Sequence, residues 1–330
     1  MPSATILGDS DGDVRMAGTL LREGQLIALP TETVYGLAGN ALLEDTVRQI
    51  FTVKGRPLID PLILHVHEWK QVESITAEIP PHARKLAEAF WPGPLTLILP
   101  KADCVSDLVT AGNPTVAVRM PAHPLARRIL QAADVPLAAP SANPFGYISP
   151  TCAAHVMDSL GERLSWIVDG GPCQAGIEST IVDVSRPDAV RLLRPGPLSP
   201  DALSATLDGL PISTHTPQDA AKPAAPGLLA RHYSPNTPLC LVSHGEQPPE
   251  APEGRCAWVA TSRQQAESSP SGYDRYWFSE TGDPEDIART LFAMLRKLDT
   301  LEHSRIYIEL PPANGIGLAL IDRLTRAAAR

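Results

Sequence analysis

The chain has 330 residues, of which 43% are hydrophobic and 20% charged, and its formal net charge at pH 7 is -9. This apolar content excludes wholesale disorder, the length suits two domains, and the acidic balance argues against a protein that binds nucleic acid nonspecifically. The five cysteines are scattered without a CxxC pair, and no secretory signal or apolar run of about 20 residues is visible. These features predict a reduced, cytoplasmic protein without a zinc site, a disulfide framework or a membrane segment.

Up to about residue 210, short apolar strands alternate with amphipathic helices, which is typical of an α/β domain. Residues 44–54 carry apolar side chains at helical spacing, with Gly55 placed to cap the helix C-terminus. Ser149 and Pro150 predict the start of another helix, as N-cap and first-turn proline. The expected strands are 26–29, 62–66, 95–99, 115–119, 137–139, 166–169, 181–184 and 190–193.

The residue pattern of the sequence changes after residue 210. Residues 211–226 read PISTHTPQDAAKPAAP and have four prolines but no apolar period, which predicts an extended linker. Beyond it we expect a smaller α/β unit, with strands near 238–243, 256–260 and 305–310, a helix from Asp283-Pro284 to about 298, and another over 316–329. The predicted division is therefore 1–210, a linker over 211–236, and 237–330.

Polar motifs follow several of the predicted strands and helices of the first domain. In Lys54-Gly55-Arg56-Pro57, two cations flank a helix end. Such cations often do no more than complement the helix macrodipole, but Arg56 lies past the glycine cap in a stiff turn, which also suits a clamp for phosphate or carboxylate.

Four more polar motifs stand at strand ends, and each by itself is an ordinary turn. Arg119 and Arg194 each end a strand, Ser141 and Asn143 follow another, and Glu178-Ser179-Thr180 enters the next. Because open α/β sheets bind ligands in crevices at strand ends, these motifs together predict a cavity. The strand at 26–29 is likewise followed by a hydroxyl-rich segment, PTETVYG.

Common catalytic and phosphate-binding patterns are missing from the sequence. It has no GxxxxGK[ST] loop, no GxGxxG after a strand and no HExxH. The acidic DSDGD segment at 9–13 has its glycine misplaced for a calcium loop. Several cations and hydroxyls without an evident nucleophile indicate positioning and charge stabilisation rather than covalent catalysis.

The ordered motifs closely resemble the threonylcarbamoyl-AMP synthase family, the YrdC-like proteins, over about residues 10–205. They are PTETVYGL (30–37), KGRP (54–57), PLILH (61–65), WPGPLT (91–96), VRMP (118–121), PSAN (140–143), ESTIVD (178–183) and LRPG (193–196). Pro226-Gly227 followed by RHYSP (231–235) is similar to the segment that joins this domain to the C-terminal domain of the long form.

The resemblance implies a fold, a reaction and a set of ligands. The fold would be a twisted mixed sheet with flanking helices, plus a smaller Rossmann-like α/β domain. The reaction would convert L-threonine, bicarbonate and ATP, with Mg²⁺ accompanying ATP and no protein metal site, into threonylcarbamoyl-AMP and pyrophosphate. The product would pass to a tRNA threonylcarbamoyl transferase machinery, and tRNA would be contacted at most indirectly.

Site residues are carried over by motif. A carboxylate at Asp60 would repel phosphate unless it contacts ribose or a metal. The catalytic candidates are Lys54 and Arg56; the threonine candidates are Thr33, His65, Arg119, Ser141 and Ser179; the ATP candidates are Arg56, Asp60, Thr115, Asn143, Thr151, Arg194 and Tyr233.

Other functions remain open from sequence. One is another carbamoyl-transfer enzyme, although the cysteine pairs of the YrdC-like carbamoyltransferases that mature hydrogenases are missing from this sequence. A second is a noncatalytic RNA-binding module, which the net charge disfavours. The joining segment also has two interpretations: a passive tether, or a lid that brings Arg231, His232 and Tyr233 over the cavity and excludes water.

Overall fold

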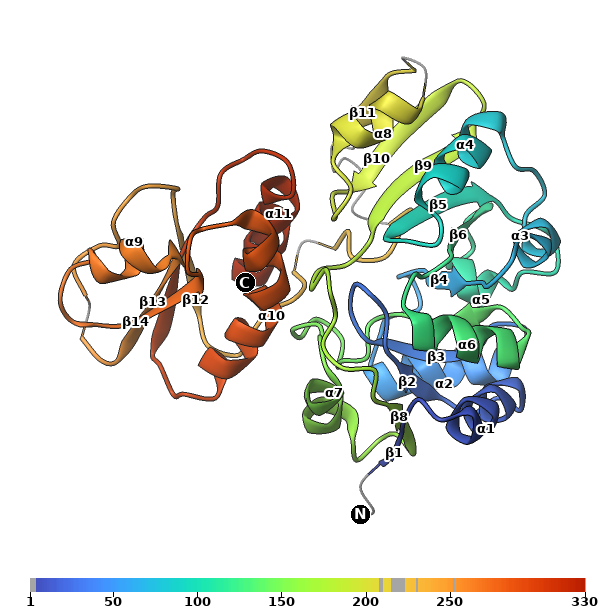
Figure 1. Cartoon of the computed structure of the whole chain (residues 1–330), viewed down its shortest axis with the longest axis horizontal. Coiled ribbons are helices and arrows are strands. Elements are labelled where there is room, and N and C mark those ends of the chain that lie inside the picture. The colour runs from blue at the N-terminus through green and yellow to red at the C-terminus, as the bar shows by residue number, and fades with distance from the viewer. Residues whose placement is uncertain (1–3, 208–209, 215–222, 230, 252, 330) are drawn as a thin grey trace.

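A computed structural model describes the chain except for residues 1–3, 208–209, 215–222, 230, 252 and 330. It forms two lobes, a large one built from the first two thirds of the chain and a small one built from the rest (Figure 1). The strands are β1 Thr5–Leu7, β2 Ile27–Leu29, β3 Gly36–Asn40, β4 Ile63–His65, β5 Leu95–Pro100, β6 Thr115–Arg119, β7 Leu137–Ala138, β8 Trp166–Val168, β9 Thr180–Arg186, β10 Ala189–Arg194, β11 Ile212–Thr214, β12 Leu239–Val242, β13 Cys256–Ser262, β14 Tyr273–Ser279 and β15 Arg305–Glu309.

Helices pack against the strands of both lobes. None of the helices in the described part of the chain is long and apolar enough to cross a membrane. The helices are α1 Asp11–Arg22, α2 Glu44–Lys54, α3 Trp69–Ile75, α4 Pro81–Phe90, α5 Asp107–Thr110, α6 Pro124–Ala133, α7 Ala153–Leu160, α8 Pro200–Thr206, α9 Arg263–Glu267, α10 Pro284–Asp299 and α11 Gly317–Ala328.

The large lobe is organised around a mixed sheet. Eleven of the described strands follow the order β1-β8-β2-β3-β7-β4-β6-β5-β9-β10-β11. Neighbours such as β4 and β6 are parallel, whereas β5 and β6 are antiparallel. The small lobe has a four-stranded sheet, β12-β15-β13-β14, in which every pair is parallel. The predicted mixed sheet with a second, smaller α/β domain is therefore confirmed.

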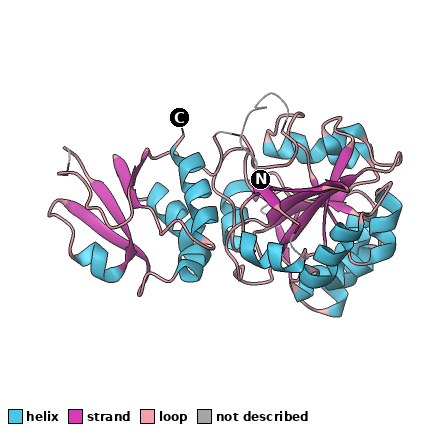
Figure 2. Cartoon of the chain, turned by 90° about the horizontal axis from the view of Figure 1, so that it is seen from above, coloured by secondary structure: helices cyan, strands magenta, loops and turns pink. Residues whose placement is uncertain are grey.

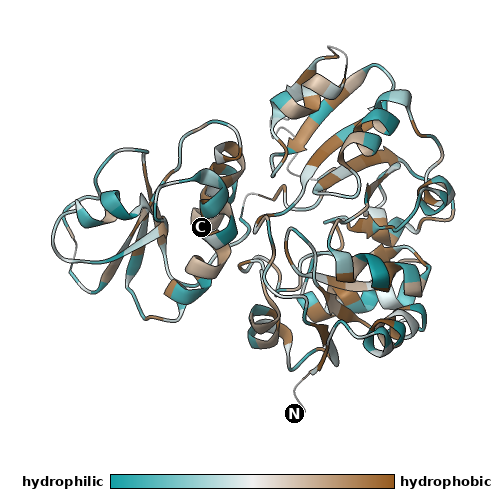
Figure 3. Cartoon of the chain, viewed as in Figure 1, coloured by the Kyte–Doolittle hydropathy of each residue, from teal (hydrophilic) through white to brown (hydrophobic). Residues whose placement is uncertain are grey.

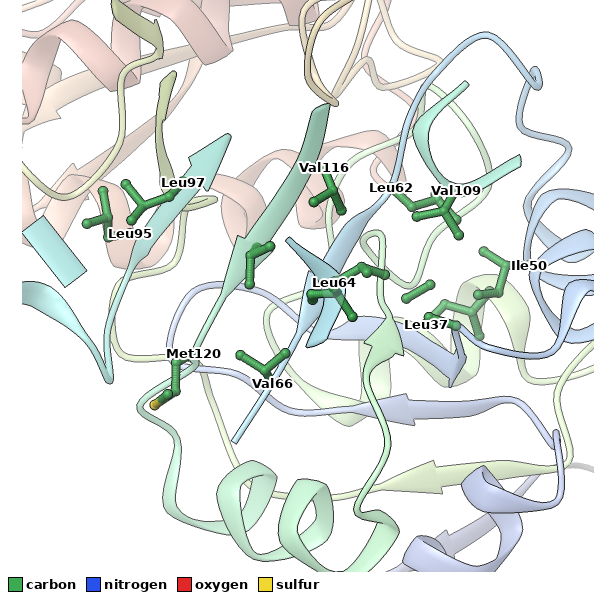
Figure 4. Packing of buried hydrophobic residues seen from close by; sticks show 14 of the residues in the cluster. Leu37, Ile50, Leu62, Leu64, Val66, Leu95, Leu97, Val109, Val116 and Met120 are labelled. Carbon is green, nitrogen blue, oxygen red and sulfur yellow. The ribbon is translucent and has the colours of Figure 1, made fainter. Parts of the chain in front are cut away.

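The cores lie on both faces of the large sheet. The main cluster packs strand residues such as Leu37, Leu64 and Val116 against helices that include α2, and Figure 4 shows these side chains meeting. A second cluster packs α1 and α6 against the strands near β2. The hydropathy colouring of Figure 3 follows this division, with brown concentrated in the strands. Burial of apolar side chains on both faces is the main stabilising contribution to such a layered domain.

Local signals account for most helix ends. Gly55 adopts a left-handed conformation at φ 64° and caps α2, as its position in the sequence predicted. Asp283 caps α10 through its side chain, which accepts hydrogen bonds from the backbone amides of Glu285 and Asp286. The prediction that Ser149-Pro150 opens a helix is wrong. The helix α7 starts later, with Cys152 as N-cap, because Ser149 is fully buried and its hydroxyl bonds Glu178 instead.

Four strands were not predicted. In β3, the sequence GLAGN lacks β-branched residues, and pairing with β2 and β7 overrides that weak propensity. The aromatic sequence YDRYWFS of β14 carried a usable signal, whereas β1 and β11 are only three residues long. Tertiary pairing therefore adds strands where local propensity is weak.

The two lobes share an apolar interface. Helices α10 and α11 lie between the small sheet and the large lobe, and α9 covers the opposite face (Figure 2). The first-domain residues Val34, Ile148 and Ile177 belong to the same cluster as the side chains of α10 and α11. A Cβ at Gly176 would come within 2.3 Å of the Ala288 carbonyl oxygen, so this close approach requires glycine.

The predicted linker begins with β11, which pairs in parallel with β10, so its first residues belong to the sheet rather than to an extended connection. Residues 215–222 and 230 of this predicted segment lie outside the described residues. Farther along, Ala225 joins a cluster with Ile63, Ile98 and Ile181 on the face of the large sheet. The described residues around Ala225 therefore pack against that face of the large sheet.

Candidate functional site

A small cavity lies between the large sheet, two loops of the first domain and the joining segment. Its volume is about 50 Å³, room for only a few water molecules. Polar, mostly buried side chains contribute much of its wall. The lining residues are Thr31, Thr33, Val34, Gly36, Arg56, Ile63, His65, Arg119, Ala139, Pro140, Ser141, Glu178, Ser179, Arg194, Pro226, Gly227, His232 and Tyr233.

One group of side chains, the Arg119 cluster, consists of Glu32, Thr33, His65 and Arg119. The parallel pairing of β4 and β6 sets His65 beside Arg119. Arg119 Nη1 donates a hydrogen bond of 2.8 Å to Thr33 Oγ1, and Arg119 Nη2 lies 2.7 Å from Glu32 Oε1. That ion pair lacks hydrogen-bond geometry, since both atoms are without a partner among the described residues. Nη2 is therefore the one terminal nitrogen of Arg119 that makes no hydrogen bond among the described residues, so its donors remain unused.

Burial and charge act differently on the titratable members of the Arg119 cluster. Burial, assisted by the charge of Arg119, lowers the pKa of His65 from 6.5 to about 3. Burial is the largest single influence on Glu32 and opposes its ionisation, but the charge of Arg119 together with polar contacts from Arg119 and the backbone outweighs burial, so the pKa of Glu32 lies below its ordinary value. At neutral pH the cluster holds a neutral imidazole and a carboxylate–guanidinium pair.

The second group, the Arg56 cluster, consists of Lys54, Arg56, Asp60 and Arg194. After the turn at Gly55, the Arg56 guanidinium folds back on its own loop, where Nε donates to Asp60 O at 3.1 Å and Nη2 donates to Pro61 O at 2.7 Å. Arg56 Nη2 also lies 2.9 Å from Asp60 Oδ2, and both side chains are almost fully buried. Neither carboxylate oxygen of Asp60 has a hydrogen-bond partner in the described part of the chain.

Lys54 holds a loop of the cavity wall. Its ammonium donates to Ser141 O at 2.5 Å and to Asn143 O at 2.7 Å. Burial, together with the charge of Arg56, lowers the pKa of Lys54 well below its ordinary value. The long stem of Lys54 thus carries a buried donor that fixes the backbone bearing Ser141, rather than serving the helix macrodipole.

Arg194 and Ser179 form a hydrogen-bonded unit on β10 and the entry to β9. Arg194 Nη2 donates to Ser179 Oγ at 3.1 Å, and Nε donates to Ser179 O at 3.1 Å. Ser179 Oγ also lies 2.8 Å from Thr96 Oγ1. Burial lowers the pKa of Arg194, so a bound anion would stabilise its charged form.

The joining segment closes the cavity from the other side. Arg194 Nη1 donates to Pro226 O at 3.1 Å. Tyr233 is 1% exposed, its ring stacks on Phe292 of α10, and its hydroxyl lacks a hydrogen-bond partner among the residues described. Burial raises the pKa of Tyr233 to about 12 and keeps the neighbouring His232 neutral by lowering its pKa well below 6.5.

The structure brings eight of the predicted site residues onto the cavity wall: Thr33, Arg56, His65, Arg119, Ser141, Ser179, Arg194 and Tyr233. Lys54 and Asp60 lie behind Arg56. Asn143 turns away, since its amide donates to Pro144 O and Tyr147 O. Thr115 starts β6, and the Thr151 backbone amide donates to His155 Nδ1; neither threonine lines the cavity.

Two glutamates at the site were not among the site residues assigned from the sequence. Glu32 pairs with Arg119 and Glu178 lines the cavity. Glu32 lies in the motif PTETVYG and Glu178 in the motif ESTIVD. The signal that could have identified them was a single charged residue in a strand end that is otherwise apolar or rich in hydroxyls. His232, which the lid interpretation of the sequence brought over the cavity, lines it beside Tyr233.

Two other surface features were considered as sites. A larger, open pocket of about 990 Å³ lies where the loop at 144–147 meets α7, α10 and the joining segment. It contains none of the residues assigned to threonine or ATP, but Arg231, which the lid interpretation placed over the cavity, lines this open pocket instead. His67, Glu68 and Asp134 could together hold a metal ion, but two of them are exposed and none lines the cavity.

The fold and the cavity define a two-domain α/β protein with a buried cavity that is lined by arginines and hydroxyls. A family model described as "Telomere recombination", which covers Sua5, YciO and YrdC proteins, matches residues 19–196. A second model, "Threonylcarbamoyl-AMP synthase, C-terminal domain", matches residues 198–329. The chain belongs to this Sua5, YciO and YrdC family, in the form that carries the C-terminal domain.

Individual relatives are similar over nearly their full length. A threonylcarbamoyl-AMP synthase of Pyrococcus abyssi is 40% identical over 324 residues, covering 96% of this chain and 94% of the relative. One of Bacillus subtilis is 39% identical over 332 residues, covering 98% and 94%. A crystal structure of P. abyssi Sua5 complexed with L-threonine superimposes with a TM-score of 0.87 at 36% identity and covers 98% of each chain.

Proposed function

We propose that this protein is an L-threonylcarbamoyladenylate synthase, a nucleotidyltransferase that forms threonylcarbamoyl-AMP and pyrophosphate from L-threonine, bicarbonate and ATP. The observation that carries the proposal is the buried cavity in which three arginines, Arg56, Arg119 and Arg194, meet a set of hydroxyls. Guanidinium groups suit carboxylate and phosphate, and hydroxyls suit an amino acid that bears one.

The Arg119 cluster supplies the amino-acid end. Arg119, through its unused Nη2 donor, would bind the threonine carboxylate. The hydroxyls of Thr33, Ser141 and Ser179 would contact the hydroxyl of the bound threonine. The neutral His65 offers an imidazole that can accept a hydrogen bond without adding charge. Threonine held in this way presents its amine for reaction with bicarbonate; the new N–C bond gives a carbamate, and the displaced oxygen leaves as water.

The Arg56 cluster supplies the phosphate end. A carbamate oxygen would attack the α-phosphorus of ATP, and pyrophosphate would leave. Arg56 and Arg194 would neutralise the developing charge, and Lys54 would contribute by holding the Ser141 loop. Thr115, Asn143, Thr151 and Tyr233 remain proposed contacts of ATP.

Magnesium would enter as part of the ATP substrate. The Asp60 carboxylate is buried without a hydrogen bond from the described residues, and such an oxygen donor is of the kind Mg²⁺ prefers. Asp60 could therefore hold the ion that accompanies the phosphates, which removes the repulsion expected of a bare carboxylate. The ion would supply further charge neutralisation at the phosphates.

A moving lid is part of the proposal, because a cavity of about 50 Å³ is far too small for ATP and threonine together. The joining segment supplies the cavity-lining residues Pro226, Gly227, His232 and Tyr233, so it must withdraw for substrates to enter and return to exclude water from the labile product. Limited proteolysis within 225–236 should slow when ATP and threonine are added, and Tyr233→Phe should impair turnover less than Tyr233→Ala. Cleavage that ignores both ligands would favour a passive tether.

We further propose that the product passes to a tRNA threonylcarbamoyl transferase machinery, with tRNA contacted at most indirectly. The arginines of the cavity are buried, so they cannot serve the extended backbone of an RNA, which speaks against a noncatalytic RNA-binding module. We also propose a cytoplasmic location, in which the five cysteines would stay reduced.

The decisive experiment is pyrophosphate release by the purified full chain. We expect release that requires threonine, bicarbonate, ATP and Mg²⁺ together, with threonylcarbamoyl-AMP detected by mass spectrometry. Omission of bicarbonate is the sharpest control, because simple amino-acid activation does not need it. Release without bicarbonate would contradict the proposed reaction, and binding of RNA without any turnover would restore the noncatalytic alternative.

A further inference from the structure

A buried arginine crosses from the small lobe to the large one beside the cavity. Arg323 lies on α11, and its side chain is 0% exposed. Its Nε donates to Glu178 Oε2 at 2.8 Å, its Nη2 donates to Pro195 O at 3.0 Å, and its Nη1 donates to Asp322 Oδ2 at 2.6 Å. Two of its three partners therefore belong to the first domain.

These two partners adjoin residues of the cavity wall. Glu178 precedes Ser179, and Pro195 follows Arg194. Ser179 and Arg194 are themselves joined by two hydrogen bonds. One guanidinium from the small lobe thus fixes both chain segments that carry this hydrogen-bonded unit, and Glu178 also lines the cavity.

The same guanidinium supports the lid. Its Cζ lies 5.4 Å from the centre of the Tyr233 ring, within the range of a cation–π contact. Glu178 is held from its other side as well, because the Ser149 hydroxyl donates to Glu178 Oε1 at 2.6 Å. The first domain, the lid and α11 therefore meet at Arg323.

Arg296 on α10 provides a matched comparison. It is also a buried arginine of the small lobe that reaches the first domain, where it donates to Ile148 O at 2.5 Å and to Ser159 Oγ at 2.8 Å, with longer bonds to His155 O at 3.3 Å and Ser149 O at 3.4 Å. None of these four partners lines the cavity. Arg296 approaches the site only indirectly, through the backbone of Ser149, whereas Arg323 bonds the cavity-lining Glu178 directly.

We infer that Arg323 is a positioning residue for the substrate cavity, through which the C-terminal domain holds Ser179, Arg194 and Tyr233 in their binding geometry. This inference rests on the proposed function. It means that the small lobe completes the site: without Arg323 the buried carboxylate of Glu178 keeps its hydrogen bond from Ser149 but loses its counterion, beside a place meant for anions.

The test compares Arg323→Met with Arg296→Met in the full chain. Arg323→Met should raise the KM values for threonine and ATP by about ten- to hundredfold, the equivalent of one lost charge-assisted hydrogen bond. Arg296→Met should lower the unfolding midpoint comparably and leave both KM values near those of the wild type. Arg323→Lys should give a smaller rise, because its single ammonium keeps the charge but cannot span Glu178 and Pro195 together.

Each outcome decides between the possibilities. Wild-type KM values in Arg323→Met, or an equal rise in Arg296→Met, would overturn the inference and leave Arg323 as an anchor of the lobe interface. If Arg323→Met does not fold, Arg323→Lys and the double variant Arg323→Met with Glu178→Gln, which removes the unpaired charge, carry the same comparison: unchanged KM values in both would overturn it. Failure of the wild type to release pyrophosphate in the presence of threonine and bicarbonate would instead contradict the proposed function.

Discussion

The Arg119 cluster and the Arg56 cluster each bury an arginine against a carboxylate, yet they hold the carboxylate differently. In the first, burial is the largest single influence, but the charge of Arg119 and the polar contacts of Glu32 together overcome it, and the pKa of Glu32 is lowered. In the second, burial dominates over the charges of Arg56, Lys54 and Arg194, and the pKa of Asp60 is raised. Both pairs are close, at 2.7 Å and 2.9 Å.

The difference indicates which arginine can more readily exchange its carboxylate partner for an anionic ligand. Glu32 is a stable anion whose removal would leave Arg119 without a counterion. Asp60 is a poorly stabilised anion among three cations, and a phosphate group with its metal ion would satisfy those cations better. The amino-acid end is thus preformed, whereas the phosphate end gains its best electrostatic partner only when the nucleotide binds.

The largest expected effect comes from removing Arg56. Arg56→Ala should lower kcat/KM for pyrophosphate release by about 10²–10³-fold, because a preorganised cation at the reacting phosphate is lost. It should also destabilise the fold by about 3 kcal/mol, because Asp60 stays buried without its partner. Combining Arg56→Ala with Asp60→Asn should restore the stability but not the activity, measured by urea unfolding and turnover. Arg48→Ala, which breaks an exposed ion pair on the preceding helix α2, is the control, and near-wild-type turnover of Arg56→Ala would remove Arg56 from the site.

Amino-acid choice should depend on the hydroxyls near the Arg119 cluster. Valine, which lacks the hydroxyl of threonine, should be turned over at least about a hundredfold less efficiently, because the polar groups of the site would be left unpaired. Serine, which lacks only a methyl group, should lose about tenfold. Rates of pyrophosphate release with the three amino acids test this, and comparable turnover of valine would contradict the assignment of Thr33, Ser141 and Ser179.

The two carboxylates can be compared directly by neutral substitution. Glu32→Gln should lower the free energy of unfolding by about 2 kcal/mol at pH 7 and raise the KM for threonine, because a favourable buried pair is broken. Asp60→Asn should change the free energy of unfolding by less than about 1 kcal/mol, because the anion it replaces is poorly stabilised. Equal losses of stability in the two variants, measured by urea unfolding, would refute the contrast between the clusters.

The last prediction concerns the free energy of unfolding in acid, and the effect expected on activity at pH 7 is the smallest. Unfolded His65 binds a proton below about 6.5, whereas the native residue, facing Arg119 and Glu32, does so only near pH 3. The stability contributed by neutral His65 is therefore lost as pH falls through that window, by about 2 kcal/mol between pH 7 and pH 5. His65→Gln should reduce this loss, measured by urea unfolding at both pH values; the raised pKa of Asp60 acts in the opposite direction in both proteins and cancels in the comparison. An identical loss in wild type and His65→Gln would show that His65 does not titrate in this way.

The sequence predicted the elements whose signals are local. The strand Thr115–Arg119 and the helix Glu44–Lys54 were predicted with the bounds that the structure gives them, because alternation, helical spacing and the cap at Gly55 lie within a few residues of one another. The Ser149-Pro150 helix start failed because a tertiary hydrogen bond to Glu178 claimed the serine. Strand β3 was missed because its glycines carry no propensity and only its neighbours make it a strand.

By itself the sequence determined the two α/β units, the motifs that bear the site and the cationic, hydroxyl-rich chemistry of that site, since these follow from residue type and spacing. Only the tertiary structure decided which side chains meet. It turned Asn143 away from the cavity, set Lys54 against backbone carbonyls, paired Glu32 with Arg119 and brought Arg323 from the last helix to Glu178. Those contacts join residues up to 145 positions apart, and their geometry depends on sheet order and the packing of the lobes, which no local pattern encodes.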